Sequence, residues 1–153
     1  MLDISHNEEF QEINMNNIYK VIYYLLENNQ PFNIVCEYKN IEFKPELPSD
    51  ITDMFGEHIL FSIVGYSFES SVLNSDIFLF EAGFGSENIG TVVNVPLLNI
   101  KQILVNEIPI LINMASSSVK KKVIKKNKDD SQIKNSMEAL LNNPKNKKFI
   151  KKS

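Results

Sequence analysis

Few side chains in this chain are of the types that carry out acid–base, nucleophilic or metal chemistry. The two histidines and the single cysteine, His6, His58 and Cys36, are scattered, so no spacing matches a set of zinc ligands. His58 begins an apolar run, where a surface position is expected rather than a general base. Neither the phosphate-binding loop G-x-x-x-x-G-K-S/T nor the nucleophile elbow G-x-S-x-G occurs. We therefore expect a protein that is not an enzyme and that uses no metal or other cofactor.

The remaining candidates for chemistry have structural explanations. Gly83 and Gly85 flank a phenylalanine, a pattern typical of a hairpin turn. Cys36 lies in an apolar alternating run, which predicts a small buried hydrophobe rather than a nucleophile. Because it is the only cysteine, no internal disulfide can form, and a reducing compartment fits.

Charge is divided sharply along the chain. Residues 1–115 carry four lysines and 16 acidic residues, a net charge near −12, whereas residues 116–153 carry twelve lysines and three acidic residues. An acidic body repels nucleic acid and anionic membranes, while a basic tail attracts both. The chain has no arginine, so no guanidinium group is present for bidentate binding of phosphate or carboxylate.

The sequence predicts a cytoplasmic location. The first residues are acidic, where a signal peptide needs a basic region. No apolar run approaches the roughly 18 residues that a membrane span requires. We expect a soluble protein without a membrane partner.

One helix precedes the predicted strands. Residues 1–15 are polar and are expected to be flexible, and apolar residues then recur at helical spacing over residues 16–28. The apolar arc is wider than one core contact needs. The helix is therefore either set deep in its own domain or packed against a second subunit in a homodimer. The candidate dimer interface consists of Tyr19, Ile22, Tyr23 and Leu26.

After Pro31 the apolar period becomes that of strands. The run at residues 58–65 is apolar enough for the centre of a sheet, and Pro109 favours an edge position for the last strand. Residues 97–104 suit one or two helical turns. One helix and five or six antiparallel strands predict a mainly β fold, a small barrel or sandwich, over residues 16–115. The predicted strands are residues 32–38, 40–44, 58–65, 77–84, 91–95 and 108–114.

Four segments resemble the stringent starvation protein B (SspB) family, bacterial adaptors of the ClpXP protease. They are Y-Y-L-L-E-N at residues 23–28, H-I-L-F-S-I at residues 58–63, F-E-A-G-F-G-S at residues 80–86 and V-N-V-P-L at residues 93–97. Their order and spacing cover roughly residues 18–114. Gly83 stands where the family has arginine.

The resemblance implies a fold and a binding activity. The fold would be an SspB-like (Sm-like) β-barrel or sandwich, with an N-terminal helix that often mediates dimerisation. The activity would be binding of an extended peptide, typically an ssrA-type degradation tag, in a groove. The small side chain of Ala82 would admit the peptide backbone between Phe80 and Phe84, although core packing explains both phenylalanines equally well. The implied groove residues are Ile63, Phe68, Phe80, Ala82 and Phe84.

The tail completes the resemblance. Residues 116–143 are too charged to bury a core and read as a flexible linker, within which residues 131–143 could form a short helix. Residues 144–153 contain K-F-I-K, which resembles the family motif that docks on the N-terminal zinc-binding domain of the ClpX unfoldase. The implied docking residues are Lys148, Phe149, Ile150 and Lys151.

Two other functions are compatible with the composition. A nucleic-acid-associated small barrel would bind through the lysine-rich tail, and its affinity would fall steeply with salt. A secretion-type chaperone would hold unfolded chains without sequence specificity. Since the body has four lysines, we do not expect nucleic acid as a partner of the folded domain.

Overall fold

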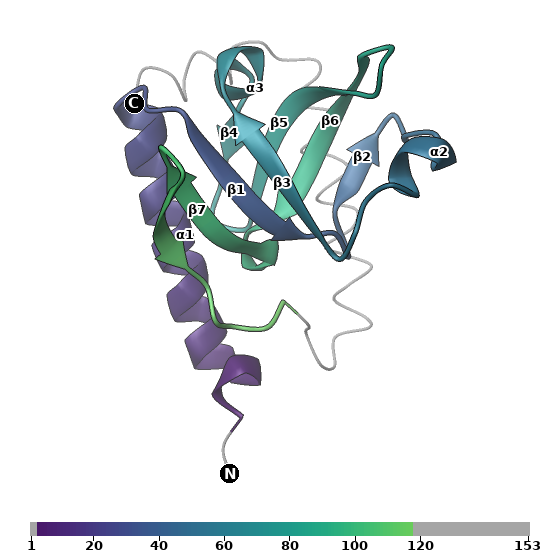
Figure 1. The fold of residues 1–153 in the computed structure, drawn as a ribbon. Helices are drawn as coiled ribbons and strands as arrows, with labels where there is room; N and C mark the ends of the chain where they lie inside the picture. The colour runs from purple at the N-terminus through teal and green to yellow at the C-terminus, as the bar shows by residue number, and fades with distance from the viewer. Residues whose placement is uncertain (1–2, 118–153) are drawn as a thin grey trace.

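The computed structural model describes residues 3–117 (Figure 1). Helix α1 (Glu8–Glu27) follows a 3₁₀ turn, η1 (Ile4–His6). It begins eight residues before the predicted start because the Asn7 side chain accepts a hydrogen bond from the Phe10 N–H (2.9 Å). Residues 8–15 are thus helical instead of flexible. Within residues 3–117 no helix combines the length and apolar character needed to cross a membrane.

In the described part of the chain, eight strands form two four-stranded antiparallel sheets. Sheet A has the order β3-β1-β7-β8, and sheet B has the order β2-β6-β5-β4. Short helical segments connect the strands: α2 (Ser49–Thr52), α3 (Gly65–Glu69) and the 3₁₀ turn η2 (Leu97–Asn99). A mainly β fold with an N-terminal helix is therefore confirmed. The strands are β1 (Phe32–Glu37), β2 (Glu42–Lys44), β3 (His58–Ile63), β4 (Val72–Leu73), β5 (Ile77–Phe84), β6 (Ile89–Pro96), β7 (Ile100–Val105) and β8 (Ile108–Ile112).

Two sequence-based predictions were wrong in detail. Strand β3 is an edge strand, not the centre of a sheet, and its side chains alternate between exposed and buried. Residues 100–104 belong to β7, so only residues 97–99 form a helical turn. A β-bulge in β7 explains the second of these errors. Val35 pairs with Gln102 and Cys36 with Ile100, which leaves Lys101 as an extra residue in β7. The bulge gives Ile100 and Ile103 one buried face despite a helix-like spacing.

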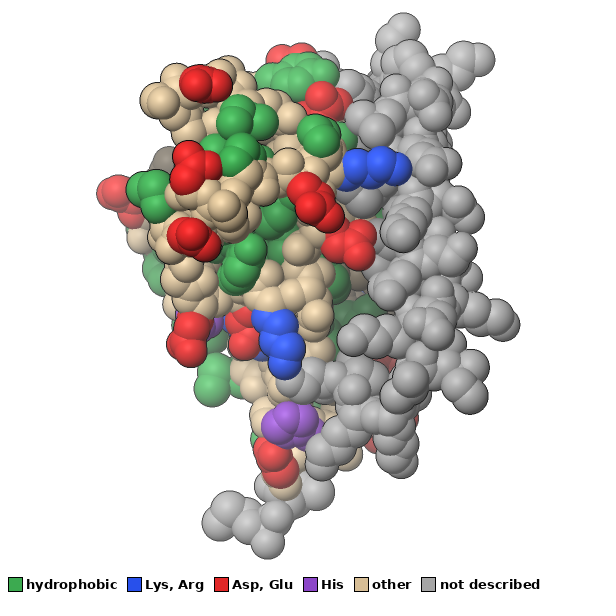
Figure 2. All heavy atoms as spheres, turned by 90° about the vertical axis from the view of Figure 1, so that its right-hand side faces the viewer, with side chains coloured by type: hydrophobic (Ala, Val, Ile, Leu, Met, Phe, Trp, Pro, Cys, Tyr) green, Lys and Arg blue, Asp and Glu red, His purple; other side chains and the backbone are tan. Residues whose placement is uncertain are grey.

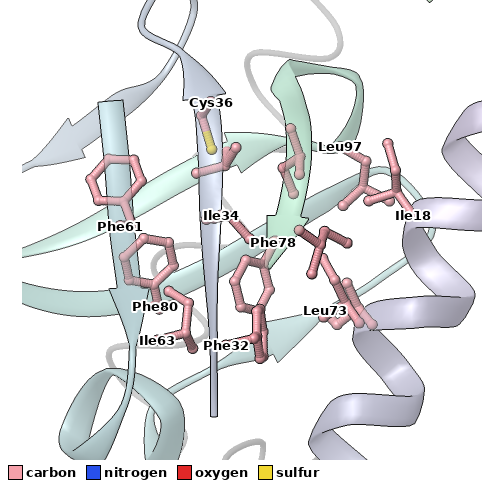
Figure 3. Close-up of a cluster of buried hydrophobic side chains, with 14 of the residues drawn as sticks. Ile18, Phe32, Ile34, Cys36, Phe61, Ile63, Leu73, Phe78, Phe80 and Leu97 are labelled. Carbon is pink, nitrogen blue, oxygen red and sulfur yellow. The ribbon is translucent and has the colours of Figure 1, made fainter. Parts of the chain in front are cut away.

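The main core lies between the two sheets (Figure 3). Phe61 and Ile63 of β3 face Phe80 of β5, and the Phe61 and Phe80 ring centroids are 5.3 Å apart. Helix α1 closes one end of the core with buried residues that include Ile18 and Ile22. The core thus has a sheet on each side and a helix at one end. This packing fixes the positions of β3 and β5 relative to one another.

Candidate functional site

The five predicted groove residues lie on β3, α3 and β5, around the boundary between the two sheets. Helix α3 follows β3 and is bonded to the middle of β5. The Ser67 hydroxyl donates to the Glu81 carbonyl (2.8 Å), and the Glu81 N–H donates to the Ser70 hydroxyl (2.9 Å). These bonds bring Phe68 beside β5, where it packs against the same core as Ala82.

Burial divides the five residues into two groups. Ile63 and Phe80 have no exposed surface and belong to the core, so they do not wall an open groove. The core-packing explanation therefore applies to Phe80. Phe68, Ala82 and Phe84 are partly buried and keep some surface open to solvent. Of the five predicted residues, these three have side chains that a ligand could touch. The ring contact of Phe68 is with Phe32 of β1, with centroids 6.4 Å apart.

An aromatic cluster extends the site beyond the predicted residues. The Phe84 ring meets Phe43, Phe55 and Phe61 edge to face, with centroid distances of 5.7, 6.1 and 6.2 Å. Such perpendicular contacts are a favoured geometry for aromatic pairs. Sequence reasoning missed Phe43, on β2, and Phe55, just after α2. The signal that could have found Phe43 is its alternation with the polar residues Glu42 and Lys44.

One edge of β5 has no strand partner at this point within residues 3–117. Strand β4 pairs with β5 only at Leu79 and Phe78. The Glu81 backbone points away from β6, toward α3, so the Gly83 backbone two residues later points to the same side. Among the described residues, no strand pairs with β5 beyond Glu81 on that side. Gly83 therefore presents an N–H and a C=O at a sheet edge.

The structure explains why position 83 is glycine. An added Cβ would lie 1.9 Å from Oδ1 of Asn88, whose side chain lies over Gly83 in the β5–β6 hairpin. Asn88 holds this place with a positive φ of 52° and an N–H that donates to the Gly85 carbonyl (3.0 Å). With Asn88 in this position, the arginine of the resembled family does not fit.

The surroundings of the site are acidic. The Glu81 carboxylate accepts a hydrogen bond from the Tyr66 hydroxyl (3.2 Å). Figure 2 shows acidic side chains spread over the side of the molecule that carries α2 and β2. Lys101 lies elsewhere, with its Nζ 3.6 Å from a Glu37 carboxylate oxygen. Lys101 is thus placed beside Glu37 of β1 rather than beside Glu81.

The candidates for reactive chemistry remain apart. Burial raises the pKa of the Cys36 thiol well above its usual value. A hydrogen bond from Ser5, with a further contribution from His6, lowers the pKa of exposed Asp3. His58 is exposed at the start of β3. Across residues 3–117 no three histidine, cysteine, aspartate or glutamate side chains gather in a way that could hold a metal ion.

A separate cavity of about 400 Å³ lies at the other end of β1. The connection from α1 to β1 and the β7–β8 turn form its walls. None of the predicted groove residues lines it. Its polar lining includes Gln30, Asn33, Asn106 and Glu107.

The predicted dimer residues are also divided by burial. Ile22 and Leu26 lie in the chain's own core, at 0% and 2% exposure, and have no surface left for a second copy. Tyr23 is 39% exposed and stacks on Tyr19, with centroids 6.0 Å apart. Tyr24, which was not predicted, is 64% exposed. The predicted linker and docking motif, including Lys148, Phe149, Ile150 and Lys151, lie outside the described residues.

Comparison with protein-family models and with curated proteins found no match to this chain.

Proposed function

We propose that this chain is a cytoplasmic adaptor of the ClpXP protease. It binds ssrA-type degradation tags at the free edge of β5 and tethers the tagged substrate to ClpX through its C-terminal tail. The observation that carries the proposal is the free edge itself. A partly exposed small residue, Ala82, lies two residues before the partly exposed Phe84 on the same face of β5, where the partner strand of β5 has ended.

An extended peptide suits this edge for a physical reason. The Gly83 N–H and C=O can bond to a peptide backbone, as in strand addition to a sheet edge. Alternate peptide side chains would then face Ala82 and the rings beside it. The floor beneath, which includes Phe80 and Ile63, is fully buried. A rigid floor lowers the ordering cost of binding, so a short peptide can bind with useful affinity.

The tail supplies the second half of the activity. Thirty residues separate Ser117 from Lys148. A flexible chain of that length has an r.m.s. span of about 30 Å, which gives an effective concentration on the order of mM. Weak docking of K-F-I-K on ClpX is then enough to hold the cargo at the unfoldase. A homodimer formed through the exposed face of α1 at Tyr23 would provide two tethers.

The test is binding of a fluorescently labelled ssrA-type tag peptide, followed by anisotropy. Ala82→Gln places a longer side chain where the peptide backbone would lie, and we expect at least a tenfold loss of affinity, about 1.4 kcal/mol. Ser75→Gln makes a similar change at an exposed turn between β4 and β5 and should leave the affinity unchanged. Equal binding by wild type and Ala82→Gln would contradict the proposed site. If the wild type does not bind the peptide at any salt concentration, the proposal that ssrA-type tags are the cargo is contradicted.

A further inference from the structure

Sheet A has an outer face that points away from the main core, and the strand registers define a row of side chains across it. Leu60 pairs with Val35, and Val35 pairs with Gln102. Gln102 in turn pairs with Ile112, so the row crosses all four strands from β3 to β8. Residues paired in an antiparallel register lie on the same face of a sheet. Along β1 and β3 the members of the row alternate with residues of the main core, so the row lies on the outer face.

The outer face is apolar and open to solvent at both sides of the sheet. Leu60 and Ile112, at the two ends of the row, are 54% and 60% exposed. Val64 follows the end of β3 and is 50% exposed, and Met114 follows the end of β8 and is 71% exposed. Four large apolar side chains thus keep half or more of their surface in water.

The centre of this face carries no charge. The neighbouring row consists of Ser62, Asn33, Leu104 and Pro109. Neither row contains a charged residue, although residues 1–115 include 16 acidic residues. Where β1 ends, Glu37 forms an ion pair with Lys101 (3.6 Å), so these two charges offset each other. Depletion of charge around exposed apolar side chains is typical of the core of a protein–protein interface.

The edge of the sheet beside this face is protected against strand addition. Pro109 of β8 has no N–H to donate to another strand. Ile110 is an extra residue between the pairs Ile103–Leu111 and Leu104–Pro109, which makes a β-bulge in the edge strand. Proline and bulges both hinder pairing at a sheet edge. A partner therefore meets the side chains of the outer face rather than the backbone of β8.

We propose that two copies of this chain pack together through the outer face of sheet A. A two-fold axis brings the same patch of both copies together, so the patch has to be complementary to itself. An apolar face without charge at its centre meets this condition, because no group on it repels its equivalent in the second copy. Sheets packed face to face interdigitate their side chains at a spacing of about 10 Å.

The size of the face fits a weak dimer. Four strands of about six residues cover roughly 19 Å by 20 Å, a footprint of about 400 Å² before the relief of the side chains is counted. Stable complexes bury about 800 Å² per partner, and transient ones bury less than about 600 Å². The proposed interface belongs to the second class, so we expect association at micromolar concentrations.

This interface leaves the candidate peptide site open. Ala82 and Phe84 pack toward the main core, on the inner side of sheet B, whereas the proposed interface uses the outer side of sheet A. The dimer therefore does not depend on the proposed peptide binding. The net charge near −12 of residues 1–115 opposes association of two copies, so salt should strengthen the dimer by screening this repulsion.

Sedimentation velocity of the full chain tests the proposal, at about 1 to 200 µM protein and at about 50 and 500 mM salt. We expect a monomer–dimer equilibrium that is tighter at the higher salt concentration. Ile112→Asp places a charge in the apolar interface and should raise the Kd at least tenfold. Ile13→Asp makes the same change on α1, at a side chain that is 52% exposed, and should leave the Kd unchanged.

Four results decide between this interface and the others. A wild type that stays monomeric throughout would overturn the proposal. A dimer that survives Ile112→Asp would also overturn it, and its loss in Tyr24→Asp would assign the contact to α1. A dimer that dissociates at high salt would overturn it in favour of the lysine-rich residues 116–153 binding an acidic body. If circular dichroism shows that Ile112→Asp has unfolded, Leu60→Ser at the other end of the row has to raise the Kd for the proposal to stand.

Discussion

Replacing Asn94 by leucine should stabilise the protein. The Asn94 amide is 1% exposed and has no hydrogen-bond partner within residues 3–117, so folding removes it from water without compensation. Leucine has nearly the same size and shape and suits a position beside Leu79 and Val92. The substitution removes the uncompensated polar group and adds apolar contacts on the buried face.

The size of the effect follows from the burial. An unsatisfied buried amide costs about 1–3 kcal/mol, so we expect Asn94→Leu to raise the free energy of unfolding by about that amount. With a urea m-value of about 1–3 kcal/mol/M for a small domain, the unfolding midpoint should rise by on the order of 1 M. Equilibrium urea unfolding followed by circular dichroism measures this directly.

Asn113 provides the matched control. It is also buried, but its side-chain nitrogen donates to the carbonyls of Leu98 (3.1 Å) and Ile100 (3.0 Å), and its oxygen accepts from the Ala115 N–H (2.8 Å). Asn113→Leu leaves these three backbone groups unpaired and should lower the free energy of unfolding by about 2–5 kcal/mol. If Asn94→Leu destabilises the protein as Asn113→Leu does, the Asn94 amide has a partner and the reasoning is refuted.

Four further predictions follow from the same structure. Gly83→Ala should lower the free energy of unfolding by less than about 1 kcal/mol, because the new Cβ meets the end of the exposed Asn88 side chain, which can rotate away, and Asn88→Gly should remove this cost; a destabilisation that persists in the double variant would contradict this. Deleting residues 145–153 should abolish degradation of tagged substrate by ClpXP and leave peptide affinity unchanged, so reduced affinity would count against a separate tether. Cys36 should resist thiol reagents at pH 8 until the domain unfolds, because burial raises its pKa; rapid labelling of native protein would show an open core. Affinity for an acidic tag peptide should rise about twofold from 50 to 300 mM salt, since salt screens repulsion from the acidic body, whereas nucleic-acid binding by the tail would weaken.

The local parts of the fold could be predicted from the sequence. Strand β5 has the predicted bounds, and the edge position of β8 follows from Pro109. Both are local signals, since side-chain alternation and a missing N–H donor act on neighbouring residues. The early start of α1 was missed although Asn7 is a favourable cap, because the polar residues that follow it hide the helical pattern.

The pairing of distant strands could not be predicted in the same way. Strand β1 lies between β3 and β7, and nothing local to the run at residues 58–65 distinguishes an edge strand from a central one. The bulge at Lys101 depends on pairing with β1, so a sequence window alone assigns Ile100 and Ile103 to a helix.

The candidate site could be predicted only in part. Ala82 and Phe84 have the small and large side chains that a peptide site needs, and they lie on one side of β5. Burial of Phe80 and Ile63 depends on how β3 crosses β5, which the sequence does not encode locally. Phe55 joins the site only because the chain returns through α2, so its role required the folded structure.

The most direct test of the proposed peptide site is an amide chemical-shift titration of the ¹⁵N-labelled full chain with an unlabelled ssrA-type tag peptide. The account predicts that the largest shifts occur at Ala82, Gly83 and Phe84 and on α3, with slower hydrogen exchange at the Gly83 amide. Saturating shifts confined to the cavity near Asn33 and Asn106, with Gly83 unchanged, would contradict it.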